Sequence, residues 1–232
     1  MGHPSTSTTE MSEQDQSAPG CPLCGSPATE REDRKTARRY QWCLRCDLVS
    51  VHPEDRVTRT SEIARYLEHD NGYHQSGYVR MLSRFLDRAV DPWCTPGAAL
   101  LDYGCGYAPV LSGIASGRGY SVRSWDPYFL PDTSALQRRY NVIAACEVME
   151  HIGEPVSALE SIHALLEPGG LLSVRSSLHP GSWEEFFRFW YIRDRTHVSY
   201  YSEHTVRFIA EHFGFSAVMI EDPFWVLQKL PE

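Results

Sequence analysis

The chain of 232 residues lacks several features that would assign it to other protein classes. No apolar run approaches the ~18–20 residues needed to cross a bilayer, and residues 1–20 lack the apolar core of a secretory signal. An excess of positive charge is also missing, because the formal net charge is −8, which disfavours sequence-independent binding to a polyanion. We therefore expect a cytoplasmic protein that neither inserts into a membrane nor binds nucleic acid.

Cysteine is present in an odd number, seven, which fits a reducing compartment better than a disulfide framework. Four of these residues form two C-x-x-C pairs, Cys21 with Cys24 and Cys43 with Cys46. Four thiolates complete the tetrahedral coordination of zinc, and a tight turn can aim each pair at one point. The spacing predicts a structural zinc site in a small ribbon over residues 21–55, with no open position for chemistry.

The segments on either side of this ribbon differ in composition. Residues 1–20 are rich in Ser, Thr, Gln and Gly, and we expect them to be disordered. Residues 61–90 are helical in pattern, and the rest of a domain over 61–232 alternates strand and helix, which predicts a parallel sheet covered on both faces. The expected strands are 98–103, 120–125, 140–146, 170–176, 215–221 and 224–230, and the expected helices are 108–117, 154–167 and 202–213.

A glycine turn follows the first of these strands. The apolar run ends around Asp102 and is followed by Gly104 and Gly106 before a helical stretch begins. Glycines suit a turn where a ligand must approach the backbone closely. The next strand ends at Asp126, and an acid at this offset can accept hydrogen bonds from both hydroxyls of a ribose. This order of elements indicates a nucleoside-binding half-fold.

Together with Ala145-Cys-Glu-Val-Met-Glu-His151 and Leu166-Glu-Pro-Gly-Gly170, these residues resemble class I S-adenosylmethionine (SAM) dependent methyltransferases from roughly residue 75 to 222. Ala108 stands where that family often has a third glycine, and Pro109 argues against a NAD dehydrogenase. The resemblance implies an α/β fold with a Rossmann-like, doubly wound sheet that ends in an antiparallel C-terminal hairpin.

The resemblance also implies where SAM binds. Asp102 would orient the loop or meet the SAM ammonium group, Asp126 would bind the ribose, and Tyr128 and Phe129 would flank the adenine. Tyr73, His74 and Tyr78 precede the first strand of the sheet and are lid candidates. The expected cofactor-binding residues are Asp102, Gly104, Cys105, Gly106, Asp126, Pro127, Tyr128, Cys146, Glu147 and Tyr78.

The segment from Glu147 to His151 holds three potential ligands for a divalent cation. Its Glu-x-x-Glu-His pattern resembles ubiquinone-biosynthesis O-methyltransferases and small-RNA 2′-O-methyltransferases, where it binds a divalent metal. The resemblance implies a site at Glu147, Glu150, His151 and His197, in which His197 supplies the later histidine. The alternative is that no metal binds and that the histidine shapes the pocket.

The expected catalytic residues follow the carboxyl ends of two strands or precede the last helix. His179 comes after the fourth strand of the predicted sheet, and imidazole titrates near neutral pH, so it is a candidate general base. With it we place Glu150, His151 and His197 in the catalytic set. The aromatic run Trp183–Ile192 is a core helix or a lid over the acceptor, and we favour the lid.

The sequence therefore predicts a SAM-dependent methyltransferase with a zinc ribbon that transfers a methyl group to oxygen or carbon of a small molecule. One alternative is an RNA methyltransferase that binds RNA through the ribbon. Another is a SAM-binding protein without catalytic activity.

Overall fold

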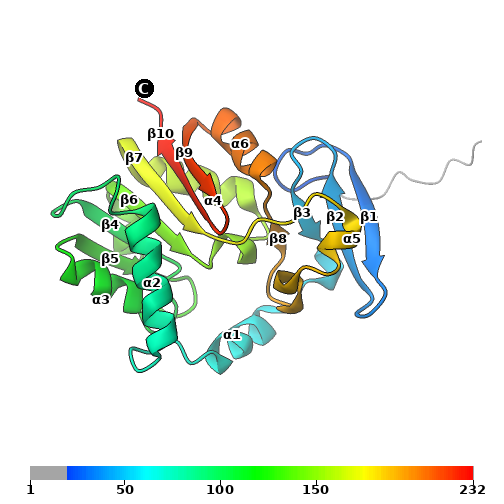
Figure 1. Ribbon diagram of the computed structural model, residues 1–232, viewed down its shortest axis with the longest axis horizontal. Coiled ribbons are helices and arrows are strands. Elements are labelled where there is room, and N and C mark those ends of the chain that lie inside the picture. Colours follow the sequence, from blue (N-terminus) through cyan, green and yellow to red (C-terminus); the bar gives the residue numbers. More distant parts are fainter. Residues whose placement is uncertain (1–19, 232) are drawn as a thin grey trace, which may run out of the picture.

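The computed structural model describes residues 20–231. The predicted disordered tail over residues 1–20 lies outside the described residues except for Gly20. Two β-sheets form the framework of the described chain, a larger sheet of six strands and a smaller one of four (Figure 1). Within residues 20–231, no helix has both the length and the apolar character that a bilayer crossing requires.

The larger sheet has the strand order β5-β4-β6-β7-β10-β9. Strands β5, β4, β6 and β7 run parallel to one another, and β10 pairs antiparallel with both β7 and β9. This is the predicted doubly wound sheet with an antiparallel C-terminal hairpin. Its strands are β4 (Ala99–Tyr103), β5 (Ser121–Trp125), β6 (Tyr140–Cys146), β7 (Leu166–Arg175), β9 (Phe215–Glu221) and β10 (Phe224–Lys229).

Helices cover both faces of this sheet because successive strand residues point to opposite sides. Leu100 packs with Phe85 of α2 on one face, whereas Leu101 belongs to a second core cluster with Ile209 of α6. The α-helices are α1 (Arg59–Glu68), α2 (Ser76–Ala89), α3 (Val110–Gly117), α4 (Pro155–Leu165), α5 (Trp183–Phe186) and α6 (Glu203–His212). The 3-10 helices are η1 (Pro53–Asp55), η2 (Thr133–Gln137), η3 (Met149–His151) and η4 (Trp190–Arg193).

The smaller sheet contains the three ribbon strands β1 (Ala28–Asp33), β2 (Arg38–Cys43) and β3 (Val49–Val51). Its fourth strand, β8 (Ser199–Tyr200), comes from the far end of the chain and pairs antiparallel with β3. Cys43, Cys46 and Leu48 also share one core cluster with residues of the larger sheet. The ribbon is therefore joined to the rest of the fold by both a common sheet and a common core.

The predicted aromatic lid divides into two parts. Its first part, α5, packs against β2, with ring centroids 5.2 Å apart for Tyr40 and Phe186 and 5.1 Å apart for Trp42 and Trp183. Figure 1 shows α5 lying against the smaller sheet beside β2, and Phe186 belongs to the core cluster of that sheet. Only the second part, which includes η4, reaches the cavity described below.

Candidate functional site

The glycine turn after β4 combines two kinds of constraint. Gly104 and Gly106 both have positive φ, +76° and +67°, a conformation that L-residues with side chains rarely adopt. A Cβ on Gly104 would lie 2.6 Å from Val148 Cγ2, so this glycine is required by the packing of the protein itself. A Cβ on Gly106 would meet nothing within 4 Å. The space beside Gly106 is therefore open to a ligand.

Asp102 stands behind this turn and does not line the cavity. Its Oδ2 accepts hydrogen bonds from Ser112 N at 3.1 Å and Ser112 Oγ at 2.7 Å, which ties the end of β4 to α3. Burial raises the pKa of Asp102 to about 6, although the hydrogen bonds from Ser112 oppose this shift. Of the two predicted roles, these contacts fit orientation of the loop rather than contact with the ammonium group.

Asp126 joins the glycine turn to the segment after β5. Its Oδ2 accepts a hydrogen bond from Gly106 N at 3.0 Å, and its Oδ1 accepts bonds from Tyr128 N at 2.8 Å and Phe129 N at 2.9 Å. The side chain still borders the cavity. Since each carboxylate oxygen has two lone pairs, Asp126 keeps acceptor capacity for a bound hydroxyl group.

These residues form one end of a cavity of about 670 Å³. Nine of the ten residues predicted to bind the cofactor line it, and Asp102 is the exception. The other end is formed by α1, η3, η4 and the loop that follows η4. Its lining includes Glu62, Arg65, Tyr66, His151, Trp190, Tyr191, Arg193, Asp194 and His197.

His151 and His197 face each other at this second end, with ring centroids 4.8 Å apart. His151 Nδ1 lies 3.2 Å from the carbonyl oxygen of Thr196, and His197 Nδ1 lies 2.8 Å from that of Tyr191. Donation from Nδ1 to a carbonyl leaves the lone pair on Nε2. Burial lowers the pKa of His151 to about 3 and of His197 to about 4. Both rings are therefore neutral at pH 7 and can act as ligands or bases.

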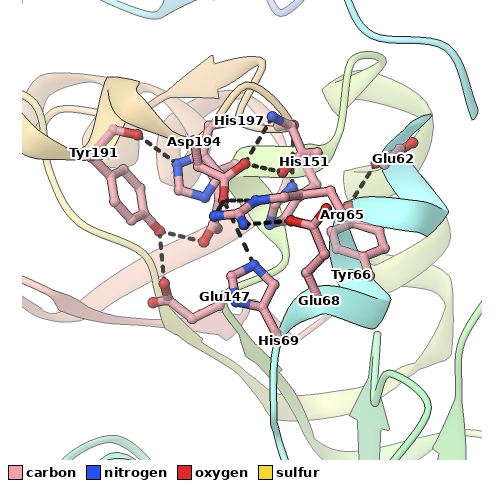
Figure 2. A network of polar contacts seen from close by, with 12 residues as sticks. Glu62, Arg65, Tyr66, Glu68, His69, Glu147, His151, Tyr191, Asp194 and His197 are labelled. Atoms are coloured by element: carbon pink, nitrogen blue, oxygen red, sulfur yellow. Dashed lines mark hydrogen bonds and ion pairs between the residues drawn. The ribbon is translucent and has the colours of Figure 1, made fainter.

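Glu150 lies beside these rings and is fully buried. Tyr191 Oη donates to both Glu150 and Glu147, and Figure 2 shows its hydroxyl directed at Glu147. Burial raises the pKa of Glu150 to about 8, and the charge of Glu147 raises it further. Glu150 Oε2 has no hydrogen-bond partner within residues 20–231. Glu150 itself does not line the cavity. A cation held between the two rings is the kind of ligand that would pair this buried oxygen.

The donor set at this end suits a divalent cation. One ligand atom from each of Glu150, His151 and His197 lies within 4.8 Å of the other two, and oxygen with imidazole nitrogen is a common set for such ions. Glu147, the fourth predicted ligand, falls outside this group because it forms an ion pair with Arg175. Its backbone has a φ of +57°, which is unusual for a residue other than glycine. The structure thus groups three of the four predicted ligands.

The four ribbon cysteines form a second candidate metal site. Their sulfur atoms lie within 4.8 Å of one another, and the Cys21–Cys46 and Cys24–Cys43 pairs are each 3.4 Å apart. Backbone N–H groups point at two of the sulfurs, from Leu23 to Cys21 and from Cys46 to Cys43. Such bonds stabilise thiolates. The cluster fits a small structural zinc site, as predicted.

His179 does not reach the cavity. Its ring packs edge-on against Trp42 at 4.9 Å, and its Nε2 lies 2.8 Å from the carbonyl oxygen of Asp47. After β7 the chain turns toward the ribbon, so the general rule for strand ends does not hold for this residue. Here His179 connects the ribbon to the larger sheet, and its position does not match the predicted catalytic role.

Of the three lid candidates that precede the first strand of the larger sheet, Tyr73, His74 and Tyr78, only Tyr78 lines the cavity. Tyr73 is 61% exposed and its hydroxyl lies over Gly113 of α3, while His74 pairs with Asp70 at the surface. Part of the cavity wall is formed instead by Glu62, Arg65 and Tyr66 of α1, a segment for which the sequence predicted a helix but no part in the site.

Two residues of α1, Tyr66 and Arg65, contact residues of the site. The ring of Tyr66 lies 5.2 Å from that of His151, and Arg65 pairs with Asp194 at 3.0 Å (Figure 2). No residue of α1 is buried, so the helix has no core-facing side that would indicate its position over the cavity. The aromatic and charged residues on one side of the helix were the available signal.

Comparisons with known proteins agree with this geometry. The family described as "Methyltransferase domain" matches residues 72–220. A 1,6-didemethyltoxoflavin-N1-methyltransferase from Burkholderia thailandensis, solved with 1,6-didemethyltoxoflavin and S-adenosylhomocysteine, is 12% identical. That match covers 88% of this chain and 100% of the other, with a TM-score of 0.50. The structure of LaPhzM is 15% identical, with 76% and 62% of the two chains covered and a TM-score of 0.51. The sequence matches no curated protein.

Proposed function

Because the chain belongs to the methyltransferase domain family, we propose that it is a SAM-dependent methyltransferase that acts on a small molecule. The observation that carries this proposal is the single cavity, which extends from the glycine turn at Gly106 to the histidine pair. A methyl donor at one end and an acceptor at the other would then share one enclosed space. In this proposal residues 21–55 are the ribbon and residues 61–232 the methyltransferase domain.

The glycine-turn end suits SAM. The open space beside Gly106 admits the methionine part of the cofactor, and the beginning of α3 favours its carboxylate. Asp126 binds the ribose hydroxyls through its remaining lone pairs, and Tyr128 and Phe129 flank the adenine. When bound, SAM supplies an electrophilic methyl group on a sulfonium centre.

The residues at the histidine end bind and orient the acceptor. Methyl transfer is an in-line displacement, so alignment of the acceptor atom contributes much of the rate. Trp190, Tyr191 and Tyr66 supply flat apolar surfaces that would hold a small acceptor in place. Nε2 of His151 or His197 can accept a hydrogen bond from a hydroxyl acceptor, although the lowered pKa of each ring weakens it as a proton acceptor.

The same end would hold a divalent cation through Glu150, His151 and His197. When bound, such a cation supplies positive charge that stabilises an acceptor oxygen in its anionic form. The hydroxyl of Tyr191 holds the carboxylate of Glu150 in place, and the carbonyls of Thr196 and Tyr191 hold the two rings. We also propose that the four ribbon cysteines bind one structural zinc ion.

A small acceptor is favoured over RNA by size and charge. A cavity of about 670 Å³ is in the range of roughly 300–1,000 Å³ typical of small-molecule sites. Helix α1 forms part of the wall of this cavity. The net charge of −8 opposes binding of a polyanion such as RNA.

The test is calorimetry with SAM followed by a transfer assay with methyl-labelled SAM. We expect one SAM per chain and label in the low-mass fraction of a metabolite extract. Label recovered in RNA would support the RNA methyltransferase alternative. Tight SAM binding without transfer to either fraction would support a non-catalytic protein.

A further inference from the structure

A ribbon residue reaches the loop that carries His197. Arg38 on β2 is only 3% exposed, and its Nη2 donates hydrogen bonds to the carbonyl oxygens of Arg195 at 2.7 Å and His197 at 3.0 Å. Both acceptors lie in the segment of residues 194–200, which we name the His197 loop. The side chain of Arg38 is thus attached to the backbone on either side of Thr196.

The rest of the guanidinium group makes no hydrogen bond, although its Cζ lies 5.7 Å from the centre of the Tyr40 ring. Arg38 Nε and Nη1 are buried and make no hydrogen bond, and none of the salt bridges found within residues 20–231 includes Arg38. Burial of an incompletely paired charge costs stability. A hydrophobic residue of similar volume would avoid this cost, so the contribution of Arg38 to folding does not account for its presence.

The His197 loop is held from two sides. On the ribbon side, Val51 N donates to Val198 O at 2.9 Å, and β3 pairs with β8 through Ser50 and Ser199. On the opposite side, Val198 N donates to Glu150 O at 2.7 Å, and His151 Nδ1 bonds Thr196 O. The loop therefore lies between the ribbon and η3.

We propose that the ribbon is a working part of the active site and that Arg38 is a positioning residue. It holds the His197 loop so that Nε2 of His197 faces His151 and Glu150. This inference rests on the proposed function, because it assigns the ribbon a task at that same site. It also explains why the ribbon is joined to the larger sheet by β8 instead of forming a separate unit.

The neighbouring basic residues Arg34 and Arg39 do not indicate another function for Arg38. Arg39 is paired with Glu54 and Asp55, and Arg34 is exposed in the turn between β1 and β2. Arg38 itself is too buried to contact a nucleic acid. Its contacts are made inside the protein, with the Tyr40 ring and with the carbonyl oxygens of Arg195 and His197.

The test compares Arg38→Met with Arg34→Met in the full chain. Mn²⁺ alone is the probe, and its affinity is measured by electron paramagnetic resonance. Zinc content, binding of S-adenosylhomocysteine, the melting temperature and hydrogen exchange of residues 194–201 are measured on the same samples. Arg38→Lys is the conservative variant, because its ammonium group keeps donors for the two carbonyls.

For Arg38→Met we expect an unchanged or higher melting temperature, unchanged zinc content and unchanged binding of S-adenosylhomocysteine. Mn²⁺ affinity should fall at least tenfold and exchange in residues 194–201 should increase, while β4 and β6 keep their protection. Arg38→Lys should recover part of the Mn²⁺ affinity, and Arg34→Met should match the wild type in every measurement.

Equal Mn²⁺ affinity and equal exchange in Arg38→Met and wild type would overturn the inference. A lower melting temperature or lost zinc in Arg38→Met would also overturn it, because Arg38 would then be structural. If the wild-type chain bound no Mn²⁺, the metal part of the proposed function would fail. The exchange measurement would then decide the role of Arg38 independently.

Discussion

The rings of His151 and His197 lie 4.8 Å apart and meet at 73°, although they come from separate segments of the chain. Each ring has its Nδ1 directed at a backbone carbonyl, so both Nε2 atoms are left for a shared partner. One ligand atom of each ring lies within 4.8 Å of the other and of a Glu150 oxygen, so the groups that would bind a cation are already close together. Preorganisation of this kind lowers the cost of binding.

His151→Ala should lower Mn²⁺ affinity by more than tenfold, because it removes one of three ligands of a single ion. His74→Ala is the matched control, since that ring pairs with Asp70 at the surface outside the cavity and its loss should leave Mn²⁺ affinity unchanged. Calorimetry or paramagnetic resonance gives the comparison.

The same site predicts the effect of chelation on the enzyme. A chelator too weak to remove the ribbon zinc should abolish methyl transfer, and Mg²⁺ or Mn²⁺ should restore it. Activity that survives chelation but is lost in His151→Ala would contradict the metal site. His151 would then act as a base or as an orienting group.

Asp126→Ala should weaken binding of SAM and S-adenosylhomocysteine by about 2–3 kcal/mol, because a charge-assisted acceptor for the ribose is lost. The change also removes the acceptor for Gly106 N, which holds the glycine turn. Asp132→Ala, at an exposed acid in the next segment, is the control. Unchanged affinity of Asp126→Ala in calorimetry would remove Asp126 from the cofactor site.

Elemental analysis should find one zinc per chain in the wild type. Cys46→Ser should lose zinc, whereas Cys94→Ser should retain it because Cys94 lies outside the cluster. Since β3 pairs with β8, zinc loss should raise hydrogen exchange at Ser199 and Tyr200 as well as in the ribbon. Four freely titrating thiols in the folded wild type would contradict the zinc site.

Asp102 predicts a pH dependence of stability. Its pKa rises from 3.8 to about 6 in the folded protein, chiefly because burial disfavours the charged form. Between these values the folded state binds more protons than the unfolded state, so stability falls as pH rises from about 4 to about 6. The full loss is at most about 3 kcal/mol. It is complete above pH 6.

Asp102→Asn should remove this dependence, because the amide oxygen can accept both bonds from Ser112 without carrying a charge. Urea unfolding of both proteins at pH 4 and pH 7 measures the difference. A wild-type stability that rises over this range relative to Asp102→Asn would show that the carboxyl group is ionised at a lower pH.

Local sequence patterns predicted the larger sheet well. The apolar run before Gly104 and the acid at its end mark β4, because buried parallel strands are short apolar segments between turn signals. Strand β5 is an edge strand with no buried residue, so Asp126 is the main signal for its end. The two C-x-x-C pairs predicted the cysteine cluster, because the two cysteines of each pair are separated by only two residues.

The approach of His197 to Glu150 and His151 was implied by the family resemblance, but the other contacts between distant segments could not be predicted. The two-residue strand β8 has no periodicity to detect, and nothing near Arg38 indicates that it reaches His197. Tyr191 lies in a run of aromatic residues, and the sequence does not show which of them turns toward Glu150. The prediction placed His179 in the cleft because side chains after parallel strands usually point there. The residue instead contacts Asp47 of the ribbon, which the strand pattern does not indicate.

The pairing of Ser50 with Ser199 also determines when the protein can finish folding during synthesis. Strands β1, β2 and β3 leave the ribosome early, but the partner of β3 follows only after β4 to β7, four of the six strands of the larger sheet, have been made. Contacts between such distant segments form slowly. Until then the outer edge of β3 presents free N–H and C=O groups, which can pair with other chains. The ribbon is therefore exposed to aggregation on the ribosome until residues 199–200 have been made and can pair with β3.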